Sequence, residues 1–146
     1  MQENYTKVIF RIEQDEDGYP PINVESVWAE PVSKNEFKIK NIPFYVKNLS
    51  LDDIVLAKPA TDGMLEYVAH RVKSSHNTIR ILFLDESQKD AVFKKIESLG
   101  CSWEGSNIPS LIAVDVPNSV DKSALFSFLE LGVKNQLWEC EESTRR

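Results

Sequence analysis

The chain has 146 residues, 42% of them hydrophobic, and a formal net charge of −6. A chain of this length can bury about two thirds of its unfolded surface, so it can form a stable core without disulfide or metal staples. It contains no run of about 18 apolar residues, no export signal and no cluster of Lys and Arg, so we expect a cytoplasmic protein that binds neither membranes nor nucleic acids.

Residues 1–77 predict a small all-β domain. Short runs of β-branched and aromatic residues are separated by turn signals, and no helical period is sustained. About five short strands of this kind are typical of a small closed or half-closed barrel. The expected strands are Lys7–Glu13, Val24–Pro31, Glu36–Ile42, Ile54–Pro59 and Leu65–Val72.

A polar stretch from Lys73 to Asn77 is the expected domain boundary. It is too short to let two domains tumble freely. The second domain is therefore predicted to occupy residues 78–146.

The sequence of the second domain predicts the element order strand, helix, strand, strand, helix, strand. Thr78–Leu84 and Leu111–Val116 are apolar on both faces, whereas Cys101–Glu104 and Leu137–Glu141 are mixed or alternating. The first and third strands are therefore expected in the middle of an antiparallel sheet, with the second and fourth at its edges. This pattern predicts an α+β, ferredoxin-like fold with two helices on one sheet face. We expect the barrel to pack against the other face.

The two helices carry their own start and stop signals. Ser87 is expected to cap the first helix, and Gly100 to end it. The second helix is expected to begin near Ser119 or Asp121 and to end at Gly132.

The sequence contains no recognisable set of catalytic residues. His70 and His76 have no Cys or second His at ligand spacing, and the glycines form no phosphate-binding motif. Asp52 and Asp53 are adjacent, so in extended chain their carboxylates point apart, and a turn explains them. We expect no metal, no cofactor and no catalytic residue, and hence no enzyme.

The densest acidic feature consists of Glu13, Asp15, Glu16 and Asp17, followed by an aromatic residue, Tyr19. One interpretation is a solvated hairpin turn. The other is a rigid acidic loop that receives Arg or Lys from a partner. A calcium loop is excluded because its sixth position, counted from Asp15, would be a proline.

Five segments stand out along the chain: Phe10–Glu13, Gly18–Pro21, Val27–Pro31, Asn41–Phe44 and Gly105–Pro109. Through them the region between Lys7 and Glu142 resembles the bacterial domain-of-unknown-function family 4265. The resemblance implies a bacterial protein. It implies no activity, ligand or site residue.

The leading functional hypothesis is a non-enzymatic binding protein, such as an immunity protein that occludes the active site of a basic toxin domain. Small size, acidity and the missing active site favour it. The chain is expected to be a monomer. The residues expected to meet cations on the partner are Asp15, Glu16, Asp17, Tyr19, Asp52 and Asp53.

The alternative is a small-molecule sensor or enzyme with a pocket where the barrel meets the sheet, because domain junctions favour concave sites. Arg80 could there hold an anionic ligand. A salt bridge on the sheet face is the competing interpretation of Arg80.

Overall fold

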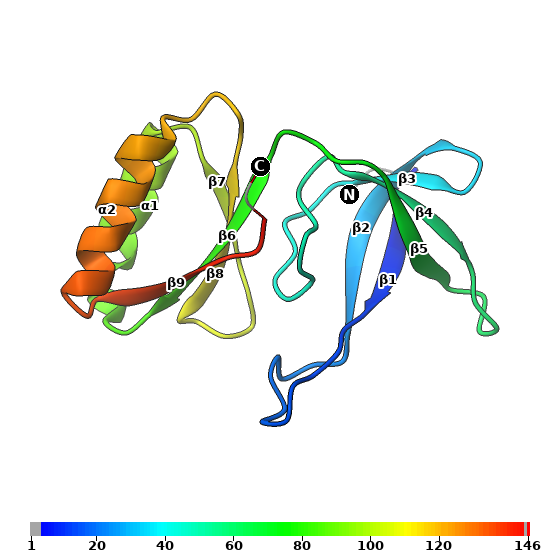
Figure 1. Ribbon diagram of the computed structural model, residues 1–146, viewed down its shortest axis with the longest axis horizontal. Coiled ribbons are helices and arrows are strands. Elements are labelled where there is room, and N and C mark those ends of the chain that lie inside the picture. The colour runs from blue at the N-terminus through cyan, green and yellow to red at the C-terminus, as the bar shows by residue number, and fades with distance from the viewer. Residues whose placement is uncertain (1–3, 145) are drawn as a thin grey trace. The chain divides into compact units, whose positions relative to one another are not determined.

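The structure is a computed structural model that describes residues 4–144 and 146 (Figure 1). The chain divides into two compact units, Met1–Ser74 and Ser75–Arg146. The division falls inside the polar stretch between Lys73 and Asn77. Ser74 is tied to the first unit, because its backbone N–H donates to Asp53 and its hydroxyl donates to the Leu51 carbonyl.

The first unit is a closed barrel with the strand order β1-β2-β3-β4-β5. Consecutive strands pair antiparallel, and a parallel pairing of β1 with β5 closes the barrel. The strands are β1 (Thr6–Arg11), β2 (Val24–Ser33), β3 (Glu36–Ile39), β4 (Ile54–Pro59) and β5 (Leu65–Val72). The prediction of a strand barrel is confirmed.

Alternation along these strands builds the barrel core, because successive side chains point to opposite faces. The buried inward-facing residues include Val8 and Phe10 on β1, Val27 and Ala29 on β2, and Val55 and Ala57 on β4. β3 ends at Ile39, three residues before the expected end. The side chain of Asn41 replaces the strand pairing there, since its Oδ1 accepts from the Trp28 amide at 2.6 Å.

The second unit is an antiparallel sheet of order β7-β8-β6-β9. Figure 1 shows both helices on the same face of this sheet. The central strands β6 and β8 are the first and third in sequence, so the predicted middle and edge positions are confirmed. The elements are β6 (Asn77–Phe83), η1 (Glu86–Gln88), α1 (Lys89–Ser98), β7 (Ser102–Gly105), β8 (Leu111–Val116), α2 (Lys122–Lys134) and β9 (Trp138–Glu142).

The helix boundaries differ from prediction at two points. Ser87 lies within the 3-10 turn η1, where it donates to the capping carboxylate of Asp85, so it does not cap α1. α2 begins as expected, with Asp121 accepting from the Ala124 amide at 3.1 Å. It continues past Gly132, which therefore lies inside the helix and not at its end.

Gly132 allows a close approach between α2 and β9. A Cβ atom at this position would overlap the indole ring of Trp138. That ring is buried and donates from Nε1 to the Leu129 carbonyl at 3.0 Å. The glycine therefore serves helix-to-strand packing.

Candidate functional site

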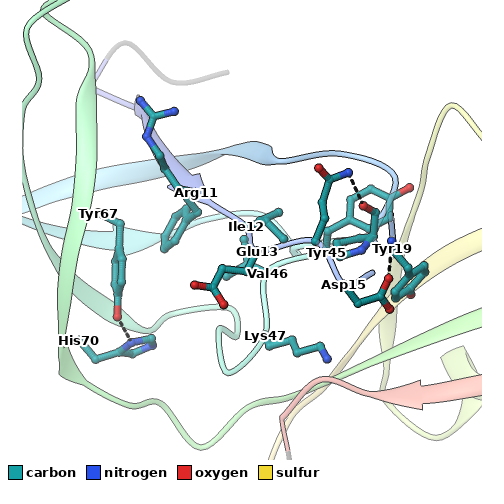
Figure 2. Close-up of a pocket in the computed structure, with 13 residues that line it drawn as sticks. Arg11, Ile12, Glu13, Asp15, Tyr19, Tyr45, Val46, Lys47, Tyr67 and His70 are labelled. Carbon is teal, nitrogen blue, oxygen red and sulfur yellow. Dashed lines mark hydrogen bonds between the residues drawn. The ribbon is translucent and has the colours of Figure 1, made fainter. Parts of the chain in front are cut away.

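A cleft of about 510 Å³ opens in the barrel unit. Its walls are the end of β1 with the loop that follows it, the segment from Tyr45 to Lys47, and two side chains of β5, Tyr67 and His70 (Figure 2). All of these residues belong to the first unit. The cleft is a property of the barrel alone.

Tyr67, His70 and Asp53 form a hydrogen-bonded chain at one side of the cleft. The Tyr67 hydroxyl lies 2.8 Å from Nδ1 of His70, and Nε2 of His70 lies 3.0 Å from Oδ2 of Asp53. Asp53 is fully buried. Its carboxylate also accepts from the amides of Ser50 at 3.1 Å and Ser74 at 2.8 Å.

A β-bulge brings Tyr67 and His70 together. Residues three apart in a regular strand point to opposite faces. In β5, however, Tyr67 lies opposite Ala57 and His70 lies opposite Val55, and the register skips Val68. Ala57 and Val55 both face the core, so the extra residue turns Tyr67 and His70 to the same, inner side.

The buried carboxylate fixes the direction of the chain of hydrogen bonds. An ionised carboxylate only accepts, so Nε2 of His70 carries the proton that points at Asp53. In the tautomer that carries its proton on Nε2, Nδ1 accepts from the Tyr67 hydroxyl. The phenolic oxygen of Tyr67 also accepts from the backbone of His70, which leaves one lone pair for a group in the cleft.

Tyr67 is held in place from the other side by Phe10, whose ring stacks on it with centroids 4.8 Å apart. Burial raises the pKa of the Tyr67 phenol, a hydrogen bond from the backbone of His70 to the phenolic oxygen opposes this shift, and the charge of Asp53 adds to it. The phenol is accordingly neutral near pH 7, which favours a hydrogen-bonding role over a nucleophilic one.

The acidic loop is ordered by its own hydrogen bonds. Oδ1 of Asp15 accepts from the amides of Asp17 and Tyr19, each at 2.9 Å, and Gly18 takes up a left-handed φ of 78° between them. Asp15 and Tyr19 line the cleft, and Figure 2 shows them side by side. Glu16 and Asp17 are exposed on the same loop.

Asp52 and Asp53 are adjacent in sequence, but their carboxylates lie in different surroundings. Asp52 is half-buried at a left-handed φ of 66° and its carboxylate accepts from Lys40 at 3.1 Å. Burial alone would lower the pKa of Lys40, but the hydrogen bond and charge of Asp52 outweigh it, so that pKa is raised. Asp53 is the correction: a carboxylate that is fully buried and satisfied inside the barrel cannot also meet a partner's cation.

Arg80 lies on β6, opposite Glu141 of β9. It is buried, and its Nη1 donates to Oε1 of Glu141 at 2.8 Å. The salt-bridge interpretation of Arg80 is therefore the one observed. A ligand-binding role for it stays a prediction.

His76 and Asp115 form a second histidine–carboxylate pair, in the unit Ser75–Arg146. Nδ1 of His76 lies 2.9 and 3.0 Å from the two oxygens of the buried Asp115. Across residues 4–144 and 146, no group of three or more His, Cys, Asp or Glu side chains could hold a metal ion. In that same part of the chain, no helix has both the length and the apolar character needed to cross a membrane.

Sequence reasoning did not identify Glu25 as a residue that shapes the cleft. Its carboxylate accepts from three consecutive amides, those of Phe44 at 2.7 Å, Tyr45 at 2.9 Å and Val46 at 3.0 Å. These bonds fix the cleft wall that carries Tyr45. No local pattern could reveal this contact, because about 20 residues separate the two partners.

A closed strand barrel, joined to a four-stranded sheet with two helices, defines the class as a two-unit α+β protein. The chain belongs to the family described as Domain of unknown function (DUF4265), whose model matches residues 25–140. The match confirms the resemblance noted from the sequence. It includes Glu25, Asp53, Tyr67 and His70, whereas the acidic loop precedes it.

One solved structure, entitled "Novel crystal structure of a hypothetical protein from Neisseria gonorrhoeae", is similar in fold, with a TM-score of 0.81. The two chains are 22% identical, and the alignment covers 98% of this chain and 96% of that one. At this identity the likeness concerns the fold alone. A comparison with curated proteins found no match.

Proposed function

We propose that this chain is a non-enzymatic, cytoplasmic protein-binding module that takes up a basic segment of a partner protein. In its most specific form, the proposal makes the chain an immunity protein that neutralises a basic bacterial toxin domain. The observation that carries it is the acidic loop, which is ordered by Asp15 and presents Glu16, Asp17 and the half-exposed ring of Tyr19 beside the cleft.

An ordered loop favours binding because less conformational entropy is lost when a partner docks. The loop also combines the two kinds of contact that protein interfaces use, an aromatic side chain and charged groups at the rim. The net charge of −6 would steer a basic partner toward the molecule and raise its association rate.

The binding surface proposed here is smaller than the sequence alone suggested. Asp15, Glu16, Asp17 and Tyr19 remain in it, because they lie together on one loop. Asp53 leaves it, since its carboxylate is buried, and Asp52 is engaged with Lys40.

For the unit Ser75–Arg146 we propose the ferredoxin-like arrangement. The order β7-β8-β6-β9 and the placement of α1 and α2 on one face support this proposal.

The function can be tested by selecting peptides from a random phage-displayed library on the purified protein. We expect the selected peptides to be enriched in Lys and Arg. Binding kinetics of the strongest synthetic peptide are then measured by surface plasmon resonance at several salt concentrations. The double variant Glu16→Gln/Asp17→Asn should associate several-fold more slowly and with a flatter salt dependence.

The matched control removes two exposed acids from the helices, through Glu97→Gln and Glu130→Gln, and changes the net charge by the same amount. Its association rate should stay close to that of the wild type. Neutral or acidic peptides from the selection, or equal kinetics for both double variants, would contradict the proposal.

A small-molecule sensor is the second candidate function. The cleft volume of about 510 Å³ lies within the range of ligand pockets, and the ordered Tyr67 and His70 side chains supply converging polar groups. This candidate predicts that a free small molecule binds in the cleft and that peptides do not.

A further inference from the structure

We propose that the barrel cleft is a specific receptor for an arginine side chain of the partner, held between the carboxylate of Glu13 and the phenolic oxygen of Tyr67. This inference rests on the proposed function and deepens it. It assigns the recognition chemistry to the cleft, whereas the acidic loop supplies the long-range attraction.

The first step is the polarity of the cleft. The hydrogen bond between His70 and Tyr67 holds the phenolic oxygen at the cleft wall, where its remaining lone pair can accept from a ligand. In Figure 2 the carboxylate of Glu13 points toward the side of the cleft that Tyr67 and His70 occupy. Two acceptors that face one space call for a ligand with several donors.

The charged residues that line the cleft favour a positively charged ligand. The cations of the lining are Arg11 and Lys47, and its anions are Glu13 and Asp15. Arg11 is ion-paired with Glu66 at 2.5 Å. Figure 2 shows the ends of Arg11 and Lys47 directed away from the space between Glu13 and Tyr67. That space is therefore dominated by acceptors and suits a cation.

The shape of the cleft favours a flat cationic group. The cleft offers aromatic surface from Tyr67, which is stacked on Phe10, and from Tyr45, whose backbone Glu25 fixes. A guanidinium is planar, donates in a fork that matches a carboxylate, and stacks on aromatic rings. An ammonium offers neither the fork nor the flat face. The observations therefore favour arginine over lysine.

The test is an NMR titration of the full-length protein with a blocked tripeptide, acetyl-Gly-Arg-Gly-amide. Matched probes replace arginine with citrulline, which keeps the shape without the charge, or with lysine. A further probe, agmatine, carries the guanidinium as a free small molecule. We expect the arginine peptide to bind most tightly and to shift the signals of Glu13, Tyr45 and Tyr67.

Two variants probe the acceptors. Glu13→Gln and Tyr67→Phe should each weaken the arginine peptide by about tenfold or more, as expected for the loss of a hydrogen bond to a charged group. Glu97→Gln, on the exposed side of α1, is the control and should bind like the wild type. Circular dichroism of each variant establishes that the barrel is intact, and Glu13→Gln alone suffices if Tyr67→Phe does not fold.

Each contrary outcome has a distinct meaning. Equal binding of the citrulline or lysine peptide, or unchanged affinity in Glu13→Gln, would overturn the arginine site. If basic peptides still require Glu16 and Asp17, the proposed function survives that result. If agmatine binds and the arginine peptide does not, a partner's arginine side chain is ruled out as the ligand, and the small-molecule sensor is supported. If no basic peptide binds at all, both the site and the function fail.

Discussion

The substitution Gly132→Ala tests the packing of α2 against β9 in the second unit most directly. In an exposed helix this change would stabilise the protein by about 1 kcal/mol, because alanine has the higher helix propensity. Here the added Cβ would overlap the ring of Trp138 on β9. The structure therefore predicts the opposite sign from the helix propensity.

The size of the effect follows from what holds the Trp138 ring. The ring is 3% exposed, and it packs against Phe83 and Phe128 with centroids 6.4 and 5.4 Å away. Displacing it costs about 1–3 kcal/mol for overpacking, and about 1 kcal/mol more if the hydrogen bond to Leu129 breaks. After the propensity gain of about 1 kcal/mol is subtracted, we expect a net destabilisation of about 1–3 kcal/mol when the hydrogen bond breaks, and of up to about 2 kcal/mol when it is kept.

The assay is urea unfolding followed by the helical circular dichroism signal. In the described part of the chain both α-helices belong to the second unit, so this signal reports on that unit. Ser127→Ala, at an exposed position of the same helix, is the control and should change stability by less than about 0.5 kcal/mol. A Gly132→Ala variant as stable as the control would refute the close approach of α2 to β9.

Three further results are expected. Asp53→Ala should destabilise the barrel by about 2–4 kcal/mol, because it leaves buried donors without their carboxylate, whereas Asp52→Asn should cost less than about 1 kcal/mol; denaturant unfolding compares the two. The pKa of Tyr67 is raised above 10.0 in the folded state, so the stability that this shift contributes is complete below pH 10 and is lost as pH rises through the folded pKa. The free energy of unfolding, measured between pH 9 and 12, should therefore decrease less steeply with pH in Tyr67→Phe than in the wild type. Burial raises the pKa of the Cys101 thiol to about 11, so a thiol reagent at pH 8 should modify Cys101 only after unfolding. Peptide mass mapping separates Cys101 from the exposed Cys140, and rapid modification of Cys101 itself in the native protein would contradict its burial.

The fold was predictable from the sequence because its signals are local. Ile79, Ile81 and Phe83 alternate with Leu82 in β6, and this apolar run on both faces identified a central strand before its neighbours were known. The turns of the barrel were equally readable. Helix ends were less so, because Gly132 has the residue type of a stop signal while its reason for being there lies on another strand.

The candidate site was not predictable, because each of its parts depends on contacts between distant residues. Period-two alternation places Tyr67 and His70 on opposite faces, and only the bulge at Val68 reverses this. The buried carboxylate of Asp53 accepts from the amide of Ser74, which lies 21 residues away. The sequence did indicate the acidic loop, because its four acids are close together in the chain.

The two histidine–carboxylate pairs change how the acidity of this protein is interpreted. Asp53 and Asp115 are buried beside His70 and His76, so neither presents its charge to a partner. Asp52 is paired with Lys40. The acidic residues that remain on the barrel surface near a concave site are concentrated on the loop from Glu13 to Asp17. This loop lies beside the cleft at which Asp53, His70 and Tyr67 form their chain of hydrogen bonds. The interior acid and the surface acids thus lie at the same cleft, and a partner that responded only to the net charge of the protein would not distinguish this cleft from exposed acids elsewhere, such as Glu97 and Glu130.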